Sequence, residues 1–246
     1  KGKISFQEVY FNYQDTNITA LKGISFTVDQ GKTLAIIGKT GCGKTTVLEL
    51  IGRMYNANSG QIKIDDIPIK DINLHSLRSS IGYVPQDPFL FSDTLNNNIK
   101  FGKNNASNQE VIDAAKNAVV HENIINFSKG YDTVLGERGI TLSGGQKQRV
   151  SIARAFIKSP QILLLDDCLS AVDTETEEQI LKNLEKITKN RTTIIVSHRI
   201  SSAKNADHII VLDEGEILQE GSHNQLISQD GYYKALYEQQ LQDALS

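Results

Sequence analysis

The sequence lacks any long hydrophobic segment and contains only two cysteines. No apolar run approaches the roughly 18–20 residues that a helix needs to cross a bilayer. Cys42 and Cys168 are far apart in the chain, with neither the spacing of a metal site nor the pattern of a disulfide framework. These absences argue against a membrane span and against a disulfide-stabilised secreted fold. The expected environment is therefore a reducing one, as in the cytosol.

An excess of positive charge is also absent. The 246 residues include 26 Lys and Arg against 29 Asp and Glu, which gives a formal net charge of −3. This balance gives no sign of a basic surface for nucleic acid or for an anionic membrane, so no nucleic-acid partner is expected. The chain is long enough for one large domain or two small ones, and no internal repeat or low-complexity linker divides it.

The clearest feature that is present is a glycine-rich segment that matches the pattern G-x-x-x-x-G-K-[ST]. An apolar run of strand length, 33–37, precedes it, and a helix-like segment, 47–51, follows it. Such a loop lets backbone N–H groups surround phosphates while the helix N-terminus adds a partial positive charge. Lys44 is expected to reach the β- and γ-phosphates, and the Thr45 hydroxyl is expected to bind Mg²⁺. The sequence therefore predicts a nucleoside triphosphate site formed by Gly38, Lys39, Thr40, Gly41, Cys42, Gly43, Lys44, Thr45 and Thr46.

A second element of a phosphate site lies later in the chain. The apolar run 162–165 ends in Asp166, which is the pattern of a buried parallel strand that presents a carboxylate at its C-terminal edge. In P-loop enzymes this carboxylate is the Walker B aspartate, which holds Mg²⁺. A core strand followed by an acidic turn would be common on its own. Its presence together with a P-loop favours the metal-binding interpretation and adds Asp166 to the predicted Mg²⁺ site.

The rest of the pattern predicts a mixed α/β chain. The early strands suggest an antiparallel β layer, 87–159 is mostly helical, and the later strands alternate with helices, which implies a parallel sheet. The polar tail Gln239–Ser246 follows two short helices and is expected to fray. Strands are expected at 4–13, 20–29, 33–37, 61–64, 81–85, 161–165, 192–197, 209–212 and 216–219.

A serine–glycine–glycine stretch begins the basic helix predicted at 144–158 and forms a second anion site in the same chain. Its sequence, Leu142-Ser143-Gly144-Gly145-Gln146, resembles the signature motif of ATP-binding cassette (ABC) ATPases. The resemblance covers essentially the whole chain, and the motifs occur in the family's order. It implies an α/β fold with a P-loop NTPase (RecA-like) core around a parallel sheet, an antiparallel β subdomain and an α-helical subdomain. On this basis 1–246 is one ABC ATPase domain, with 1–86 and 160–246 as the core and 87–159 as the helical subdomain.

The resemblance also implies roles for individual residues, with ATP and Mg²⁺ as the cofactors. Tyr13 matches the aromatic residue that stacks on adenine, although a tyrosine that only packs in a strand is an alternative. Gln86 matches the Q-loop glutamine that reaches Mg²⁺ and the attacking water. His198 matches the switch histidine that contacts the γ-phosphate. The family forms head-to-tail dimers, so the residues expected to face the partner's nucleotide are Ser143, Gly144, Gly145, Gln146 and, in the D-loop, Asp173.

Two further stretches resemble the exporter branch of the family. One is 77–95, and the other is Gly136-Glu137-Arg138-Gly139, which matches the X-loop that senses the intracellular loops of a transmembrane domain. The chain is therefore expected to be a module of a longer exporter, with a transmembrane domain fused upstream. Its expected place is the cytoplasmic face of the membrane, and its expected partner is a second nucleotide-binding domain.

One position departs from the family pattern. The family usually has glutamate directly after the Walker B aspartate, as general base or water-orienting residue, whereas this chain has Asp167. Aspartate is one methylene shorter, which is roughly 1.5 Å of reach. A misplacement near 1 Å can cost about 10²-fold in rate, so this site is expected to hydrolyse ATP slowly or not at all. This departure resembles the degenerate half of heterodimeric exporters, which makes a non-identical partner the leading hypothesis.

Several alternatives remain open at the level of sequence. Asp167 could act as the base through a local adjustment or an extra water. The chain could be a non-hydrolysing module that dimerises when it binds ATP. It could also be an ABC ATPase of DNA repair or translation, although long coiled-coil insertions, tandem cassettes and a basic face are not visible. A P-loop kinase is disfavoured because 142–146 and His198 would have no role in it.

Overall fold

The computed structural model describes residues 1–136, 139–187 and 191–245. The chain divides into two compact units, which are described separately. The first unit comprises Lys1–Ile81, Gln161–Asp167 and Asn190–Ser246, and the second comprises Gly82–Pro160 and Cys168–Lys189. The sequence predicts a different functional division, with a core of 1–86 and 160–246 and a helical subdomain of 87–159. This division stays a prediction.

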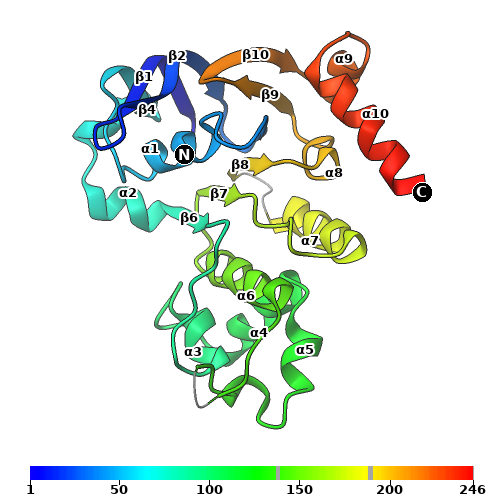
Figure 1. The fold of residues 1–246 in the computed structure, drawn as a ribbon. Coiled ribbons are helices and arrows are strands. Elements are labelled where there is room, and N and C mark those ends of the chain that lie inside the picture. Colours follow the sequence, from blue (N-terminus) through cyan, green and yellow to red (C-terminus); the bar gives the residue numbers. More distant parts are fainter. Residues whose placement is uncertain (137–138, 188–190, 246) are drawn as a thin grey trace. The chain divides into compact units, whose positions relative to one another are not determined.

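The first unit contains an antiparallel sheet, drawn in blue to cyan in Figure 1. Its order is β2 (Ile18–Val28), β1 (Ile4–Tyr13), β4 (Ser59–Ile64) and β5 (Ile67–Pro68). Inward-facing residues of neighbouring strands form its core, as where the rings of Phe6 and Phe26 stack with their centroids 4.5 Å apart. The sequence predicts this antiparallel layer but not β5, which has only two residues.

The first unit also contains a mainly parallel sheet, in which the strands run in the order β10-β9-β3-β8-β7. Four of these strands are parallel neighbours: β3 pairs with β8 and β9, and β8 pairs with β7. Every residue of β7 and β8 is buried, which explains why their sequences are continuous apolar or β-branched runs. The bounds are β3 (Thr33–Ile37), β7 (Ile162–Asp166), β8 (Thr192–Ser197), β9 (His208–Asp213) and β10 (Glu216–Gly221).

Two helices of the first unit, α1 (Lys44–Ile51) and α10 (Tyr232–Leu245), carry residues that are discussed below as parts of the candidate site. Helix α1 follows β3 directly, and α10 lies at the C-terminal end of the chain, drawn in red in Figure 1. The expectation that Gln239–Ser246 frays is wrong as far as Leu245, because the helix continues through this polar stretch. The remaining helical segments are η1 (Ile69–Asp71), α2 (Leu74–Ser80), α8 (Ile200–Ala203) and α9 (His223–Ile227).

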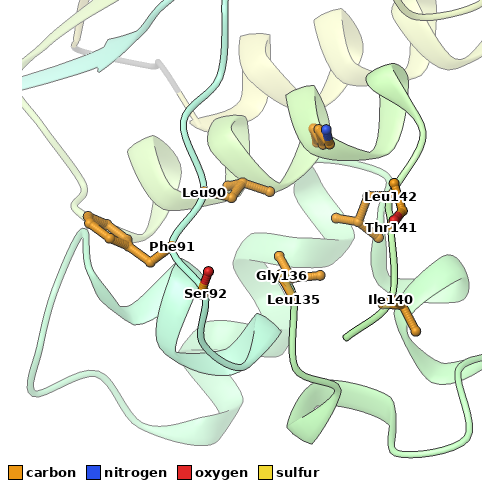
Figure 2. Close-up of a pocket in the computed structure, with 9 residues that line it drawn as sticks. Leu90, Phe91, Ser92, Leu135, Gly136, Ile140, Thr141 and Leu142 are labelled. Atoms are coloured by element: carbon orange, nitrogen blue, oxygen red, sulfur yellow. The ribbon is translucent and has the colours of Figure 1, made fainter. Parts of the chain in front are cut away.

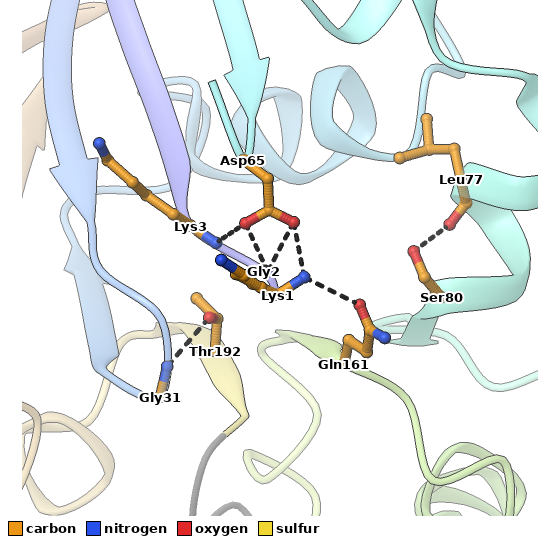
Figure 3. A network of polar contacts seen from close by, with 9 residues as sticks. All are labelled: Lys1, Gly2, Lys3, Gly31, Asp65, Leu77, Ser80, Gln161 and Thr192. Atoms are coloured by element: carbon orange, nitrogen blue, oxygen red, sulfur yellow. Dashed lines mark hydrogen bonds and ion pairs between the residues drawn. The ribbon is translucent and has the colours of Figure 1, made fainter. Parts of the chain in front are cut away.

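A polar network ties the first strand of the sheet to the turn between β4 and β5 (Figure 3). The carboxylate of Asp65 accepts hydrogen bonds from the backbone N–H groups of Gly2 and Lys3, at 2.9 and 3.1 Å for Oδ1. The backbone nitrogen of Lys1 donates to the same carboxylate at 2.6 Å. Asp65 therefore fixes the entry of the chain into β1.

The second unit is mostly helical, as the sequence pattern indicated. Its longest helices, α6 (Gly144–Ile157) and α7 (Thr174–Ile187), have 14 residues each. Ser143 begins α6 with a capping box, in which its hydroxyl accepts from Gln146 N–H and the Gln146 side chain accepts from Ser143 N–H. The other elements are β6 (Ile81–Val84), which starts at the boundary between the units, α3 (Leu95–Lys100), α4 (Asn108–Asn117), α5 (His121–Ile125) and η2 (Gly130–Asp132).

Candidate nucleotide site

The phosphate loop lies in the first unit, between the end of β3 and the start of α1. Gly43 caps the helix with φ 104°, a left-handed conformation that favours glycine. A Cβ atom at Gly43 would overlap the carbonyl oxygen of Ala20, and one at Gly38 would overlap that of Leu212. A Cβ at Gly41 would meet no atom within 4 Å. Two of the three glycines are therefore required because a side chain would not fit at their positions.

Lys44 lies inside the loop. Its Nζ donates hydrogen bonds to the carbonyl oxygens of Gly38, at 2.8 Å, and of Lys39, at 2.6 Å. Burial lowers the pKa of Lys44, and the nearby Cys42, Asp167 and Asp166 partly oppose this shift. The loop that would surround a phosphate therefore also holds the ammonium group of Lys44.

The side chains predicted to hold Mg²⁺ in the first unit meet each other. Thr45, at the start of α1, donates its hydroxyl to Asp166 Oδ1 at 3.0 Å, at the end of β7. Hydroxyl and carboxylate oxygens are hard donors of the kind that Mg²⁺ prefers, and Mg²⁺ commonly takes its other ligands from phosphate and water. Within 1–136, 139–187 and 191–245, no cluster of three or more His, Cys, Asp or Glu forms a metal site. The pair therefore fits a metal that arrives with a phosphate ligand.

The two residues expected to act on the γ-phosphate also lie together. His198 Nε2 is 3.9 Å from Asp167 Oδ2, and the Asp167 side chain is 8% exposed against 39% for His198. Burial raises the pKa of Asp167, while the neighbouring His198 and Lys44 oppose the rise. Asp167 has a φ of 41°, a strained value for a residue other than glycine. An acidic group of raised pKa beside an imidazole is suited to hold and pass a proton.

Tyr13 lies at the end of β1, where its hydroxyl donates to Glu49 Oε2 at 2.7 Å and lies 2.9 Å from Thr46 Oγ1. Burial raises the pKa of Tyr13 to about 12, so the hydroxyl stays protonated and the bond to Glu49 persists at neutral pH. The ring of Tyr55 packs edge-on against that of Tyr13, with the centroids 5.4 Å apart. Glu49 and Tyr55 were not predicted from the sequence, because neither belongs to a motif. Glu49 could have been found from its spacing, since it lies one helical turn after Thr45 on α1.

A hollow of about 610 Å³ opens beside this tyrosine. Its lining combines aromatic rings with amide and carboxylate side chains, a composition suited to a planar base with polar edges. The lining residues are Phe11, Asn12, Tyr13, Gln14, Asp15, Thr16, Met54, Tyr55, Asn56 and Asn58.

The other predicted site residues lie in the second unit. Gln86 is exposed just after β6. The preceding carbonyl, of Pro85, accepts a 3.0 Å hydrogen bond from the buried Gln148 on α6. Gly144 and Gly145 form the first turn of α6, and a Cβ on Gly145 would lie 2.9 Å from the carbonyl oxygen of Ala171. Gln148 therefore ties the segment before Gln86 to the signature helix, a contact that no sequence motif indicated.

Asp173 precedes α7 and accepts a 2.9 Å hydrogen bond from the N–H of Thr176. This bond, together with the positive charge of Arg149, lowers the pKa of Asp173. The residue is thus ionised at neutral pH and placed at the start of a helix. Its predicted role toward a partner's nucleotide stays a prediction, as do the roles of the signature residues.

A pocket of about 320 Å³ lies in the second unit beside the stretch predicted to be the X-loop (Figure 2). Of that stretch, Gly136 and Gly139 are described, whereas Glu137 and Arg138 lie outside the described residues. The pocket is lined by Leu90, Phe91, Ser92, Leu135, Gly136, Ile140, Thr141, Leu142 and Lys147. Across the described residues, no helix combines the length and the apolar character that crossing a membrane requires.

Comparison with known proteins identifies the family of the chain. The family model described as "ABC transporter" matches residues 21–170. The uncharacterized ABC transporter ATP-binding protein YfiB of Bacillus subtilis is 49% identical over 239 residues, which cover 97% of this chain and 41% of that protein. ATP-binding cassette sub-family B member 6 of Xenopus tropicalis is 48% identical over 97% of this chain and 28% of its own length.

A solved structure of a bacterial Atm1-family ABC exporter with ATP bound is similar to this chain with a TM-score of 0.92 and 42% sequence identity. The match covers 98% of this chain and 42% of the exporter chain. The present chain thus spans less than half of the length of these relatives. The chain belongs to the ABC transporter family, as an ATP-binding cassette of the exporter type.

Proposed function

We propose that this cassette binds ATP with Mg²⁺ and pairs head-to-tail with a second nucleotide-binding domain around two nucleotides. It thereby powers export through a transmembrane domain of the same transporter, at the cytoplasmic face of the membrane. The observation that supports the nucleotide site is that Lys44 and Thr45 begin α1 at the phosphate loop, where Thr45 bonds to Asp166 at the end of β7. ATP and Mg²⁺ supply a transferable phosphoryl group and a cation that neutralises its developing charge.

Each residue of the first unit has a physical task in this proposal. The loop glycines let backbone N–H groups donate to phosphate, and Lys44 adds a buried positive charge. Thr45 and Asp166 offer oxygen ligands to the cation. Tyr13, held through its hydroxyl by Glu49, presents its ring beside the 610 Å³ hollow, where an adenine base would stack.

We also propose that this site hydrolyses ATP slowly because Asp167 stands where the family usually has glutamate. Aspartate and glutamate are both carboxylates able to accept a proton, so the deficit lies in reach rather than in the type of base. A carboxylate displaced by roughly 1 Å costs about 10²-fold in rate. The partner of such a half-site is then a non-identical subunit that carries the glutamate, and the signature residues from Ser143 to Gln146 assist the partner's faster site.

The test compares three forms of the full-length transporter assembled with its partner. Asp167→Glu is expected to raise single-turnover hydrolysis at this site at least tenfold, because it restores the missing methylene, about 1.5 Å of reach. Asp167→Asn keeps the length and removes the base, so its rate should not exceed the native rate. If Asp167→Glu is no faster than the native protein, aspartate already serves the site through a local adjustment or a bound water, and the slow-site proposal fails.

The same departure at Asp167 supports a second candidate function, a module that dimerises with ATP but does not hydrolyse it. The two functions differ in the turnover of the assembled pair. Tight ATP binding with negligible hydrolysis at both sites, even beside a partner that carries glutamate, would favour the second function. The third possibility raised by the sequence, an ATPase of DNA repair or translation, has no support in the relatives described above, which are named as transporter proteins.

A further inference from the structure

The loop after β8 carries His198 and is short. It connects Ser197, the last residue of β8, to α8, which begins at Ile200. Within the loop, the N–H of Arg199 donates to the hydroxyl of Ser197 at 2.9 Å. The direction of the His198 side chain is set by the backbone of these few residues. Any group that fixes this backbone also fixes the distance between His198 and Asp167.

Gln240, on the C-terminal helix α10, makes two hydrogen bonds to this backbone. Its Nε2 donates to the carbonyl oxygen of His198 at 2.7 Å, and its Oε1 accepts from the N–H of Ile200 at 2.8 Å. The nitrogen and the oxygen of one planar amide therefore bind the two ends of the segment 198–200. This is a more exact constraint than a single bond, because shifting or rotating either peptide group breaks one of the two contacts.

The helix that carries Gln240 is itself firmly held. Tyr233 on α10 is fully buried in a cluster that includes Ile37, Ile200 and Leu226. The hydroxyl of Tyr233 lies 2.8 Å from His223 Nδ1, and the backbone N–H of Tyr233 donates to Gln219 Oε1 at 3.1 Å. Because Ile37 is the residue before the phosphate loop, the same cluster supports both the loop and the helix.

The neighbouring residue on α10 provides a contrast. Gln239 has the same side chain and is exposed, whereas Gln240 is half-buried against the His198 loop. The two hydrogen bonds to the His198 loop therefore distinguish position 240 from position 239.

We propose that Gln240 is a positioning residue for His198, through which the C-terminal helix sets how the site senses the γ-phosphate. This proposal rests on the proposed function, because it assigns to His198 the contact with that phosphate. A purely structural role for Gln240 would stabilise α10 but would affect ATP and ADP binding equally.

The experiment uses the full-length protein and compares Gln240→Ala, Gln240→Glu and the matched control Gln239→Ala. The probes are the ATP analogue ATPγS and ADP, each with Mg²⁺. Gln240→Ala should weaken ATPγS binding about fivefold or more and change ADP binding less than twofold, because only the triphosphate loses a charge-assisted hydrogen bond. Gln239→Ala should behave as the native protein with both nucleotides.

Amide hydrogen exchange gives a readout that is independent of nucleotide. Gln240→Ala should speed exchange at the N–H of Ile200, since its acceptor is removed. Gln240→Glu keeps an acceptor for that N–H but places a carboxylate against the carbonyl oxygen of His198. It should therefore preserve protection at Ile200 while still weakening ATPγS binding, which separates the two ends of the amide.

A double-mutant cycle with His198→Ala decides whether Gln240 acts through the histidine. In the His198→Ala background, adding Gln240→Ala should cause no further loss of ATPγS affinity. An equal loss in both backgrounds, or a Gln240→Ala protein that binds both nucleotides as Gln239→Ala does, would overturn the positioning role. If the native protein itself binds neither ATPγS nor ADP, the proposed function fails as well, so the two failures are distinguishable.

Discussion

Thr45 Oγ1 donates a 3.0 Å hydrogen bond to Asp166 Oδ1 and so joins two residues that are 121 positions apart in the sequence. The contact brings the first turn of α1 to the C-terminal end of β7. It depends on the parallel sheet, because the C-terminal ends of parallel strands lie at one edge and residues after them can meet. The predicted Mg²⁺ site of the first unit is therefore a product of topology.

This relationship predicts the effect of removing the Thr45 hydroxyl. Thr45→Val keeps the shape of the side chain but loses the oxygen, so ATP affinity in Mg²⁺ should fall at least about tenfold, as for other groups that orient a metal site. Thr45→Ser keeps the hydroxyl and should bind nearly as the native protein does. The measurement is ATP affinity by calorimetry with Mg²⁺ and again with EDTA. An equal loss in EDTA would show that Thr45 acts on the loop and not on the cation.

The phosphate loop offers a second prediction, from two glycines that differ in their surroundings. Gly43 and Gly41 both have positive φ, 104° and 81°, so alanine at either position is strained by about 1–2 kcal/mol. Only at Gly43 would the new Cβ also overlap backbone, at the carbonyl oxygen of Ala20. Gly43→Ala should therefore lower the free energy of unfolding by about 1–3 kcal/mol more than Gly41→Ala, as overpacking generally does.

Urea denaturation of the two variants and the native protein measures this difference. The Gly41→Ala variant serves as the control for backbone strain alone, since its Cβ meets no atom within 4 Å. Equal destabilisation by both substitutions would mean that the β2 backbone at Ala20 moves aside at little cost.

Much of the fold could be predicted because each element is specified by local sequence. The apolar runs at β3 and β7 have the length of buried strands, and both are strands. Ser143 and Gln146 form the capping box that begins the predicted helix. The phosphate loop could be recognised because its glycines, lysine and threonine follow a contiguous sequence pattern.

The contacts that could not be predicted are tertiary and involve residues outside motifs. Glu49, which accepts the hydrogen bond of Tyr13, is an ordinary helical glutamate by sequence. The tail was expected to fray because it is polar. It continues as helix to Leu245, and Gln240 within it finds partners in the His198 loop. Polarity indicates exposure only when no backbone group elsewhere needs a partner, and sequence does not show where that need arises.

The final prediction concerns the pH dependence of Asp65, whose carboxylate fixes the start of β1 (Figure 3). Partial burial raises its pKa, but the hydrogen bonds from the backbone nitrogens of Lys1, Gly2 and Lys3 outweigh this effect, so its pKa is lowered. A carboxylate whose pKa is lower in the folded state stabilises the fold above its unfolded pKa, about 3.9. That contribution is lost as the pH falls through the folded pKa.

The native protein should therefore exceed Asp65→Asn in free energy of unfolding by about 1 kcal/mol above pH 5, a value reduced because the Asp65 carboxylate is partly exposed. The difference should shrink progressively below about pH 4, where the native carboxylate becomes protonated. Urea denaturation at several pH values between 3 and 7 measures it, with Asp15→Asn as the control for loss of an exposed carboxylate in the turn after β1. A difference that stays constant across this range would mean that the asparagine loses shape complementarity rather than charge.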